Sequence, residues 1–206
     1  GVLSTVNPFT SLGEMNGYLD QFYETGVKVQ EFNSWGGGGI AGIDMNSDNM
    51  ASGAVNTRLN GSLTLANANK LTYYTDIRNV NFFLNNLNFK DTNAAAYKQC
   101  VGEAYYFRAW FYFNLFKNYG NIAWLDHTLA PDENEMNLPQ EGRTAMVDHI
   151  LSDLDKAIDL LSLQNSAATM RVHKDVARAF KSEVALYEAT WEKYHQAKND
   201  AFYDKT

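Results

Sequence analysis

Residues 93–120 read NAAAYKQCVGEAYYFRAWFYFNLFKNYG, and this stretch decides the fold class of the chain. Apolar side chains recur every three or four positions, the spacing that places them on one face of an α-helix. Aromatic residues also occupy the other faces, so we expect a central helix that is covered on several sides. Gly120 should end this helix, and Asp91 or Thr92 should cap its start.

The same periodicity predicts four more helices on either side of this one. Ser11 and Glu14 form a capping box that predicts where the first helix begins. Thr144 is expected to cap the fourth. No stretch is strongly typical of a β-strand, so the pattern predicts an all-α fold of antiparallel helices packed in pairs. The four predicted helices cover about residues 11–25, 69–87, 144–161 and 174–194.

The segment 31–66 differs from the rest of the chain. It contains Trp35 followed by four consecutive glycines, then Asp44, Asp48 and the turn-forming pair Asn60-Gly61. Four glycines in a row lose too much backbone entropy to lie inside a helix or strand. We therefore expect a long, irregular Gly-rich surface loop, of the kind usually kept for a function, within a single domain over residues 1–206.

Composition excludes several classes of function. The net charge is −7 and no basic stripe occurs, which argues against nucleic-acid binding. Cys100 is the single cysteine, and the four histidines are scattered without metal-ligand spacing, so we expect no metal. Nucleotide-binding and acyl-transfer motifs are not recognisable, so no cofactor is expected. No apolar run is long enough to span a membrane.

Three charged residues and one asparagine within the predicted helices could be taken for a catalytic group. Arg78, Asn81, Glu103 and Arg108 are spaced so that they point inward among aromatic residues. Buried charges normally pair with each other, so we interpret these residues as structural and expect Glu103 to pair with Arg78 or Arg108. Trp110, Trp124 and Trp191 are also expected in or beside packed segments. The outer face of the last helix should nevertheless expose apolar area around Phe180, Tyr187 and Trp191.

Trp35 is the aromatic residue that best suits a ligand site. Sugar recognition stacks the apolar face of a pyranose on an aromatic ring, while amides and carboxylates bind the hydroxyls. Asp44, Asp48 and many of the 22 asparagines of the chain could supply those groups. The alternative is that Trp35 packs back onto the helices and anchors the loop. Asparagine equally suits helix caps and turns.

Five segments, taken in order, resemble the SusD family of glycan-binding proteins. They are YYTDIRNVNFFL at 73–84, GEAYYFRA at 102–109, FKNYGNIAWL at 116–125, the helix at 150–161 and the helix at 171–195. The resemblance covers about two thirds of the chain. It implies a tetratricopeptide-like helical scaffold that captures oligosaccharide or polysaccharide at the bacterial cell surface, beside a SusC-like TonB-dependent transporter of the outer membrane.

The resemblance also implies where part of the sugar site lies. Asn67, Asn69 and Tyr73 stand just before the second helix, at the position that resembles part of the family's sugar site, although capping and packing would explain them as well. Members of the family are surface lipoproteins with a longer chain. Their C-terminal half and lipid-bearing cysteine do not occur in this sequence, so we expect it to be a piece of such a protein.

Together these observations predict a non-catalytic carbohydrate-binding module. The alternative is a helical-repeat scaffold that binds another protein and has no glycan affinity of its own. An enzyme ranks third, because glycoside hydrolysis needs a facing pair of carboxylates and the sequence singles out no such pair.

Overall fold

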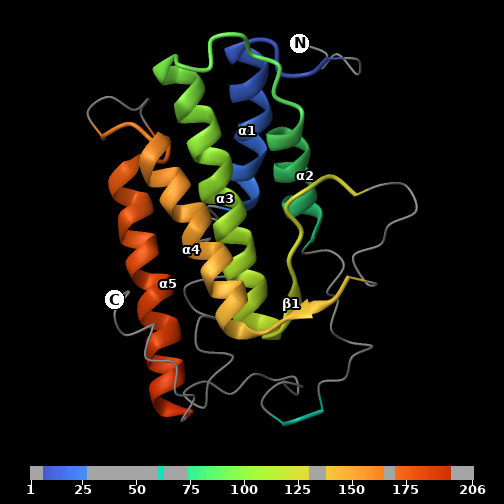
Figure 1. The fold of residues 1–206 in the computed structure, drawn as a ribbon, viewed down its shortest axis with the longest axis vertical. Helices are drawn as coiled ribbons and strands as arrows, with labels where there is room; N and C mark the ends of the chain where they lie inside the picture. The colour runs from blue at the N-terminus through green and yellow to red at the C-terminus, as the bar shows by residue number, and fades with distance from the viewer. Residues whose placement is uncertain (1–6, 27–59, 63–73, 130–137, 165–169, 196–206) are drawn as a thin grey trace, which may run out of the picture. The chain divides into compact units, whose positions relative to one another are not determined.

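The computed structural model describes residues 7–26, 60–62, 74–129, 138–164 and 170–195. Over these residues the chain is all-α apart from one pair of very short strands, which confirms the predicted fold class (Figure 1). Contacts divide the chain into residues 1–26 with 74–206, and residues 27–73. The helices and strands all belong to the first unit, and they are α1 Leu12–Gly26, α2 Tyr74–Asn85, α3 Ala95–Tyr119, β1 Ile122–Ala123, β2 Gln140–Glu141, α4 Arg143–Leu160 and α5 Lys174–Tyr194.

Helix α3 is the centre of this unit, as its sequence predicts. It packs against α1, α2 and α4, and Figure 1 shows it between α4 on one side and α1 with α2 on the other. Its buried residues face several directions: Phe107 contacts Phe22 of α1, and Tyr106 contacts Phe180 of α5. Helix α5 completes the unit by packing on α4. The described helices include none that is long and apolar enough to cross a membrane.

The start of α1 has the predicted capping box. The Glu14 carboxylate accepts hydrogen bonds from the backbone N–H groups of Thr10, at 2.9 Å, and Ser11, at 3.3 Å. In return the Ser11 hydroxyl accepts the N–H of Glu14 at 3.3 Å. Backbone donors that the first turn would leave unpaired are satisfied in this way.

Two predicted caps are wrong. Helix α3 begins after Ala94, which provides no side-chain cap, while Asp91 accepts the N–H of Asn93 within the preceding turn. Helix α4 begins after Gly142, so Thr144 lies inside its first turn. The end of α3 is as predicted, because Gly120 has a φ of 68° and donates its N–H to the carbonyl of Phe116 at 2.9 Å.

The short strands explain why α4 starts at Arg143. β1 and β2 pair antiparallel, with Ile122 opposite Glu141 and Ala123 opposite Gln140. This pairing keeps the chain extended up to Gly142, and the helix follows immediately. Two residues per strand are too few for a recognisable alternation, so the sequence does not predict them.

Helix α3 lies very close to the end of α4 at Gly102. A Cβ atom added there would lie 2.9 Å from Cγ and 3.1 Å from the backbone nitrogen of Leu161, which directly follows α4. Only glycine fits this contact without a shift of its neighbours.

The predicted apolar outer face of α5 is wrong. Phe180 is buried among Tyr106, Trp110 and Phe113 of α3, and Tyr187 packs edge-on against Phe113. Trp191 is half-buried as well, like Trp110 and Trp124. The large apolar side chains that α5 exposes are instead Leu186 and Tyr194, at 58% and 73%.

Candidate functional site

The five residues predicted to bind glycan all lie outside the described residues. Trp35 and Asp48, with the accompanying Asp44, fall in the range 27–59, and Asn67, Asn69 and Tyr73 fall in the range 63–73. Their role in glycan binding therefore stays a prediction. The described helices and the segments that join them, which we call the frame, flank these positions in the sequence: α1 ends at Gly26 and α2 begins at Tyr74.

Tyr74 fixes the point where the chain enters α2. Its buried hydroxyl donates to the carbonyl of Ala123 at 3.0 Å and accepts the N–H of the same residue at 3.1 Å. A single phenol thus satisfies both backbone groups of a buried residue. The residue that follows Tyr73 is thus tied to the segment after α3.

Tyr112 ties the same segment to the middle of the core. Its hydroxyl accepts the N–H of Leu125 at 2.7 Å and donates to the Leu125 carbonyl at 3.0 Å. Burial raises the pKa of Tyr112 well above its ordinary value, so the phenol stays neutral and keeps its proton for this bond. We call residues 121–127 the exit segment.

A buried polar network holds the exit segment against three helices. Arg108 of α3 donates from Nε and Nη2 to the two carboxylate oxygens of Asp153 on α4, at 2.6 and 2.8 Å. Its Nη1 donates to Oδ1 of Asn81 on α2 at 2.9 Å, and Nδ2 of Asn81 donates to the carbonyl of Leu125 at 2.8 Å. Burial opposes the charge on Arg108, but the hydrogen bonds and charge of Asp153 outweigh it and raise the pKa of the guanidinium.

Glu103 has a different partner from the one predicted. It pairs neither with Arg78 nor with Arg108 but with Arg171, whose Nε lies 3.0 Å and whose Nη2 lies 2.8 Å from its carboxylate oxygens. Arg171 also reaches Asp20 of α1 at 2.8 Å. It precedes α5 and is 68 residues from Glu103, so helical spacing carries no signal for this pair. Asn81, Glu103 and Arg108 are buried as predicted. The inward position predicted for Arg78 is wrong, because this residue is exposed, and the predicted pairing of Glu103 is corrected.

Trp124 is enclosed by other rings. The His149 ring stacks on the indole at 4.5 Å and 8°, and the Tyr112 ring lies 4.3 Å from it at 31°. Two rings this close cannot share one face, so both faces of Trp124 are covered. His149 Nε2 also lies 3.0 Å from Glu141 of β2. A pyranose stacks on an open ring face, so Trp124 is a support of the fold rather than a sugar platform.

Four asparagines in or next to the described helices donate to the backbone. The Nδ2 groups of Asn16, Asn86, Asn114 and Asn118 each donate to the carbonyl four residues earlier, at 2.8 to 3.0 Å. These four amides therefore bond to the backbone of their own segments rather than face outward as free sugar-binding groups.

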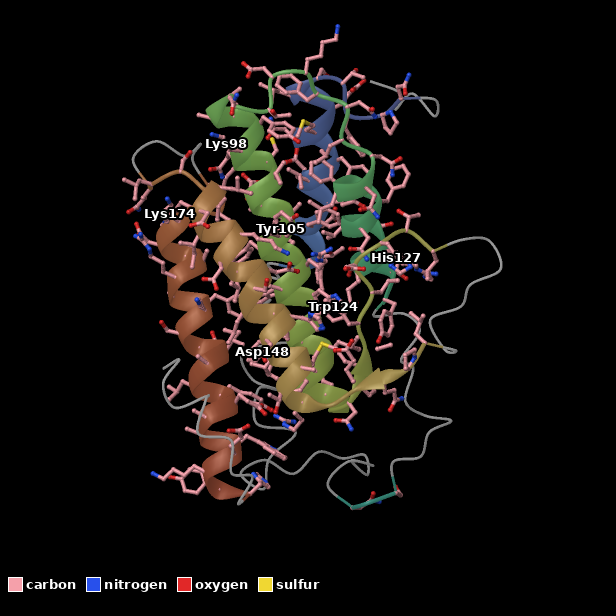
Figure 2. All side chains as sticks on the ribbon, in the orientation of Figure 1. Lys98, Tyr105, Trp124, His127, Asp148 and Lys174 are labelled. Atoms are coloured by element: carbon pink, nitrogen blue, oxygen red, sulfur yellow. The ribbon has the colours of Figure 1, made fainter. Side chains whose placement is uncertain are left out.

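A shallow depression of about 320 Å³ lies between α4 and α5. Asp148, which is labelled in Figure 2, lines it with Leu151, Ser152, Asp155 and Lys181. Lys181 and Asp155 form an ion pair across it. No aromatic ring lines this depression, and the described part of the chain holds no group of side chains that could bind a metal ion.

Comparison with known proteins gives a consistent result. The model of a family described as "Starch-binding associating with outer membrane" matches residues 7–186. A search of curated proteins gave no match. Among solved structures, a SusD-like carbohydrate-binding protein of Bacteroides fragilis has a TM-score of 0.70 at 21% identity, over 89% of this chain and 38% of its own. A surface glycan-binding protein of Bacteroides fluxus has a TM-score of 0.62 at 20% identity, over 92% of this chain and 42% of its own.

A second SusD-like protein of Bacteroides fragilis has a TM-score of 0.67 at 22% identity, over 89% of this chain and 36% of its own. The chain thus spans less than half the length of these solved proteins. At such identities the structural likeness shows the shared helical scaffold, and the family match extends from Asn7 to Leu186, over α1 to α4 and the first part of α5. On this evidence the chain belongs to the SusD-like family.

Proposed function

We propose that this chain is part of a surface protein that binds oligosaccharide without cleaving it. The observation that carries the proposal is the match of the starch-binding family model to residues 7–186. Solved proteins with the same scaffold are described as carbohydrate-binding, laminarin-binding and surface glycan-binding. The glycan and its linkage would be set by residues outside the described frame.

The proposed sugar contacts are Trp35, Asp48, Asn67, Asn69 and Tyr73. An indole supplies an apolar face for a pyranose ring, a phenol adds both a face and a hydroxyl, and carboxylate and amide groups bind sugar hydroxyls. The double hydrogen bond between Tyr74 and Ala123 supports this choice, because it anchors the chain directly beside Tyr73. A binding group next to a fixed point loses less entropy on binding.

Binding without catalysis is supported by the state of the buried carboxylates. Asp153, Glu103 and Glu188 are each held by two hydrogen bonds or more from an arginine side chain. The arginine occupies the oxygens of each carboxylate, so none of these three groups is placed to face a glycosidic bond as one of the two carboxyl groups that its hydrolysis needs.

We further propose that the whole protein delivers its glycan to a SusC-like TonB-dependent transporter and reaches the cell surface through a lipid anchor. The family description places its members in association with the outer membrane, which supports this location. The competing function is a helical scaffold that binds the transporter and has no glycan affinity of its own.

Titration calorimetry with defined oligosaccharides tests the proposal, on this chain and on a longer form that includes downstream sequence. We expect heat of binding without any released product. Trp35→Ala should abolish binding and leave the melting temperature unchanged, whereas Trp124→Phe, a change inside the frame, should lower the melting temperature and keep the affinity.

Three other outcomes would change the conclusion. A lowered melting temperature with full affinity in Trp35→Ala would assign Trp35 to packing and remove it from the site. Cleaved sugar in the reaction mixture would make the protein an enzyme. Capture of the transporter by a protein that binds no glycan would favour the scaffold.

A further inference from the structure

The sequence contains two Asn-Gly pairs, Asn16-Gly17 and Asn60-Gly61. In such a pair the backbone nitrogen of the glycine can attack the side-chain carbonyl carbon of the asparagine, because glycine has no Cβ to block the approach. The two pairs share this local chemistry. They differ in the structure around them, and that difference decides which one reacts.

Asn60 lies in an exposed turn that favours the attack. Residues 60–62 are all exposed, and Gly61 has a φ of 75°, in the left-handed region. Oδ1 of Asn60 accepts the N–H of Ser62 at 3.0 Å, so the asparagine side chain folds back over the Gly61 peptide. The same oxygen accepts the Ser62 hydroxyl at 2.6 Å.

The N–H and O–H groups of Ser62 also polarise the side-chain carbonyl group of Asn60. As a nucleophile adds to a carbonyl carbon, negative charge develops on the carbonyl oxygen, and preorganised donors stabilise that charge. The N–H and O–H groups of Ser62 are both directed at the oxygen that would carry it. The turn thus combines an unhindered nucleophile with a polarised carbonyl.

Asn16 lies in the opposite environment. It is part of α1, where its Nδ2 donates to the carbonyl of Leu12 at 2.9 Å and its Oδ1 lies 3.6 Å from the thiol sulfur of Cys100. Gly17 is inside the same helix, where backbone N–H groups bond to the carbonyl four residues earlier. Attack by its nitrogen would require the helix to open.

We propose that Asn60 is a site of spontaneous deamidation and that the fold protects Asn16. The Gly61 nitrogen loses its proton and forms a bond to Cγ of Asn60, the bond from Cγ to Nδ2 breaks, and Nδ2 leaves as ammonia with the proton. Water then opens the five-membered imide to leave an aspartyl or isoaspartyl residue at position 60. Water is the only co-reactant, and no oxidant or reductant takes part.

The product differs from the original chain in two measurable ways. Each event adds one negative charge to a protein whose net charge is −7. The isoaspartyl form also inserts a methylene group into the backbone next to Gly61. Aged protein should therefore separate into charge variants that differ at a single residue.

Peptide mass spectrometry of the folded chain tests the proposal. After incubation in mildly alkaline buffer, the peptide with Asn60 should gain the mass that replaces an amide by an acid, and the peptide with Asn16 should not. Gly61→Ala should slow the change by roughly tenfold or more, which corresponds to about 1.4 kcal/mol in the barrier. Gly17→Ala is the matched control and should leave the rate at Asn60 unchanged.

Two further measurements separate the protection that the fold gives Asn16 from the contribution of the Ser62 hydroxyl at Asn60. In denaturant both peptides should react at similar rates, which would show that the fold protects Asn16. Ser62→Ala keeps the N–H donor but removes the hydroxyl, so it should react more slowly than the original chain; an equal rate would remove the hydroxyl from the mechanism. Equal rates at Asn16 and Asn60 in the folded chain, or an unchanged Asn60 peptide, would overturn the proposal.

Discussion

The Glu14 carboxylate accepts two backbone N–H groups at the start of α1 and is otherwise exposed. The hydrogen bond from Thr10 is the largest cause that lowers the pKa of Glu14 below its ordinary value of 4.5. A depressed pKa in the folded state means that the carboxylate contributes stability above its unfolded pKa, and that this contribution is lost as the pH falls through the folded pKa.

Acidification should therefore loosen the first turn of α1 before it affects the core. An NMR titration should give Glu14 a lower pKa in the folded chain than in denaturant. Glu14→Gln should remove the acid-dependent part of α1 protection in hydrogen exchange. Equal titration of Glu14 in the folded and in the denatured chain would show that the capping box contributes nothing in solution.

Cys100 provides a second test at the scale of one residue. Its thiol is buried at 1% exposure, and burial is the main cause that raises its pKa to about 11. Since the thiolate is the reactive form, Cys100 should resist alkylating reagents in the folded protein at neutral pH. Labelling should become fast only in denaturant. Rapid labelling under native conditions would contradict the packing of α3 against α1.

At the scale of the helices, α3 can lie close to the end of α4 because Gly102 has no side chain. Gly102→Ala would place a Cβ atom 2.9 Å from Leu161 Cγ, so α3 and α4 must separate or repack. Overpacking of this kind costs about 1–3 kcal/mol. Urea denaturation should show that loss, and Gly102→Ala should cost less when it is made in a Leu161→Ala background than in the original chain.

Gly17→Ala is the control for this prediction. The added Cβ meets nothing within 4 Å on α1, so the change should stabilise the protein by about 0.5–1 kcal/mol through the better helix propensity of alanine. Equal effects of the two substitutions would mean that propensity, rather than the contact with Leu161, governs Gly102.

The helices follow from sequence periodicity because each one buries a stripe against α3 or a neighbour of α3. The length and aromatic content of 93–120 predict the central position of α3, and Gly120 predicts its end. The start of α4 depends on the pairing of Glu141 with Ile122, which are 19 residues apart in the sequence. Local cap signals such as Thr144 cannot report a contact of that kind.

At the scale of the whole molecule, the candidate site is the least predictable part. The sequence identifies inward-facing charges, but the partner of Glu103 comes from the segment just before α5 and that of Arg108 from the middle of α4. Which carboxylate meets which arginine is decided by how the helices pack, and periodicity within one helix holds no information about it. The proposed sugar contacts, from Trp35 to Tyr73, rest on chemistry and family resemblance for the same reason.

Arg171 joins segments that lie far apart in the sequence, since it is 151 residues from Asp20. It pairs with Asp20 of α1 and with the fully buried Glu103 of α3, and its own side chain is 18% exposed. Arg171→Met would leave the Glu103 carboxylate buried without its cation, a defect that costs about 3–5 kcal/mol. Because the lost contacts lie on two helices, hydrogen exchange should accelerate in α1 and in α3 together.

Arg178→Met is the matched comparison, since Arg178 pairs with Asp175 on the surface of α5 and is 56% exposed. Exposed pairs contribute about 0–1 kcal/mol, so this variant should unfold close to the original chain in urea. Arg171→Met combined with Glu103→Gln should recover part of the loss, because the uncompensated charge is gone. If the two arginine substitutions cost the same, the link between α1, α3 and the start of α5 does not stabilise the fold, and the helices are held together by apolar packing alone.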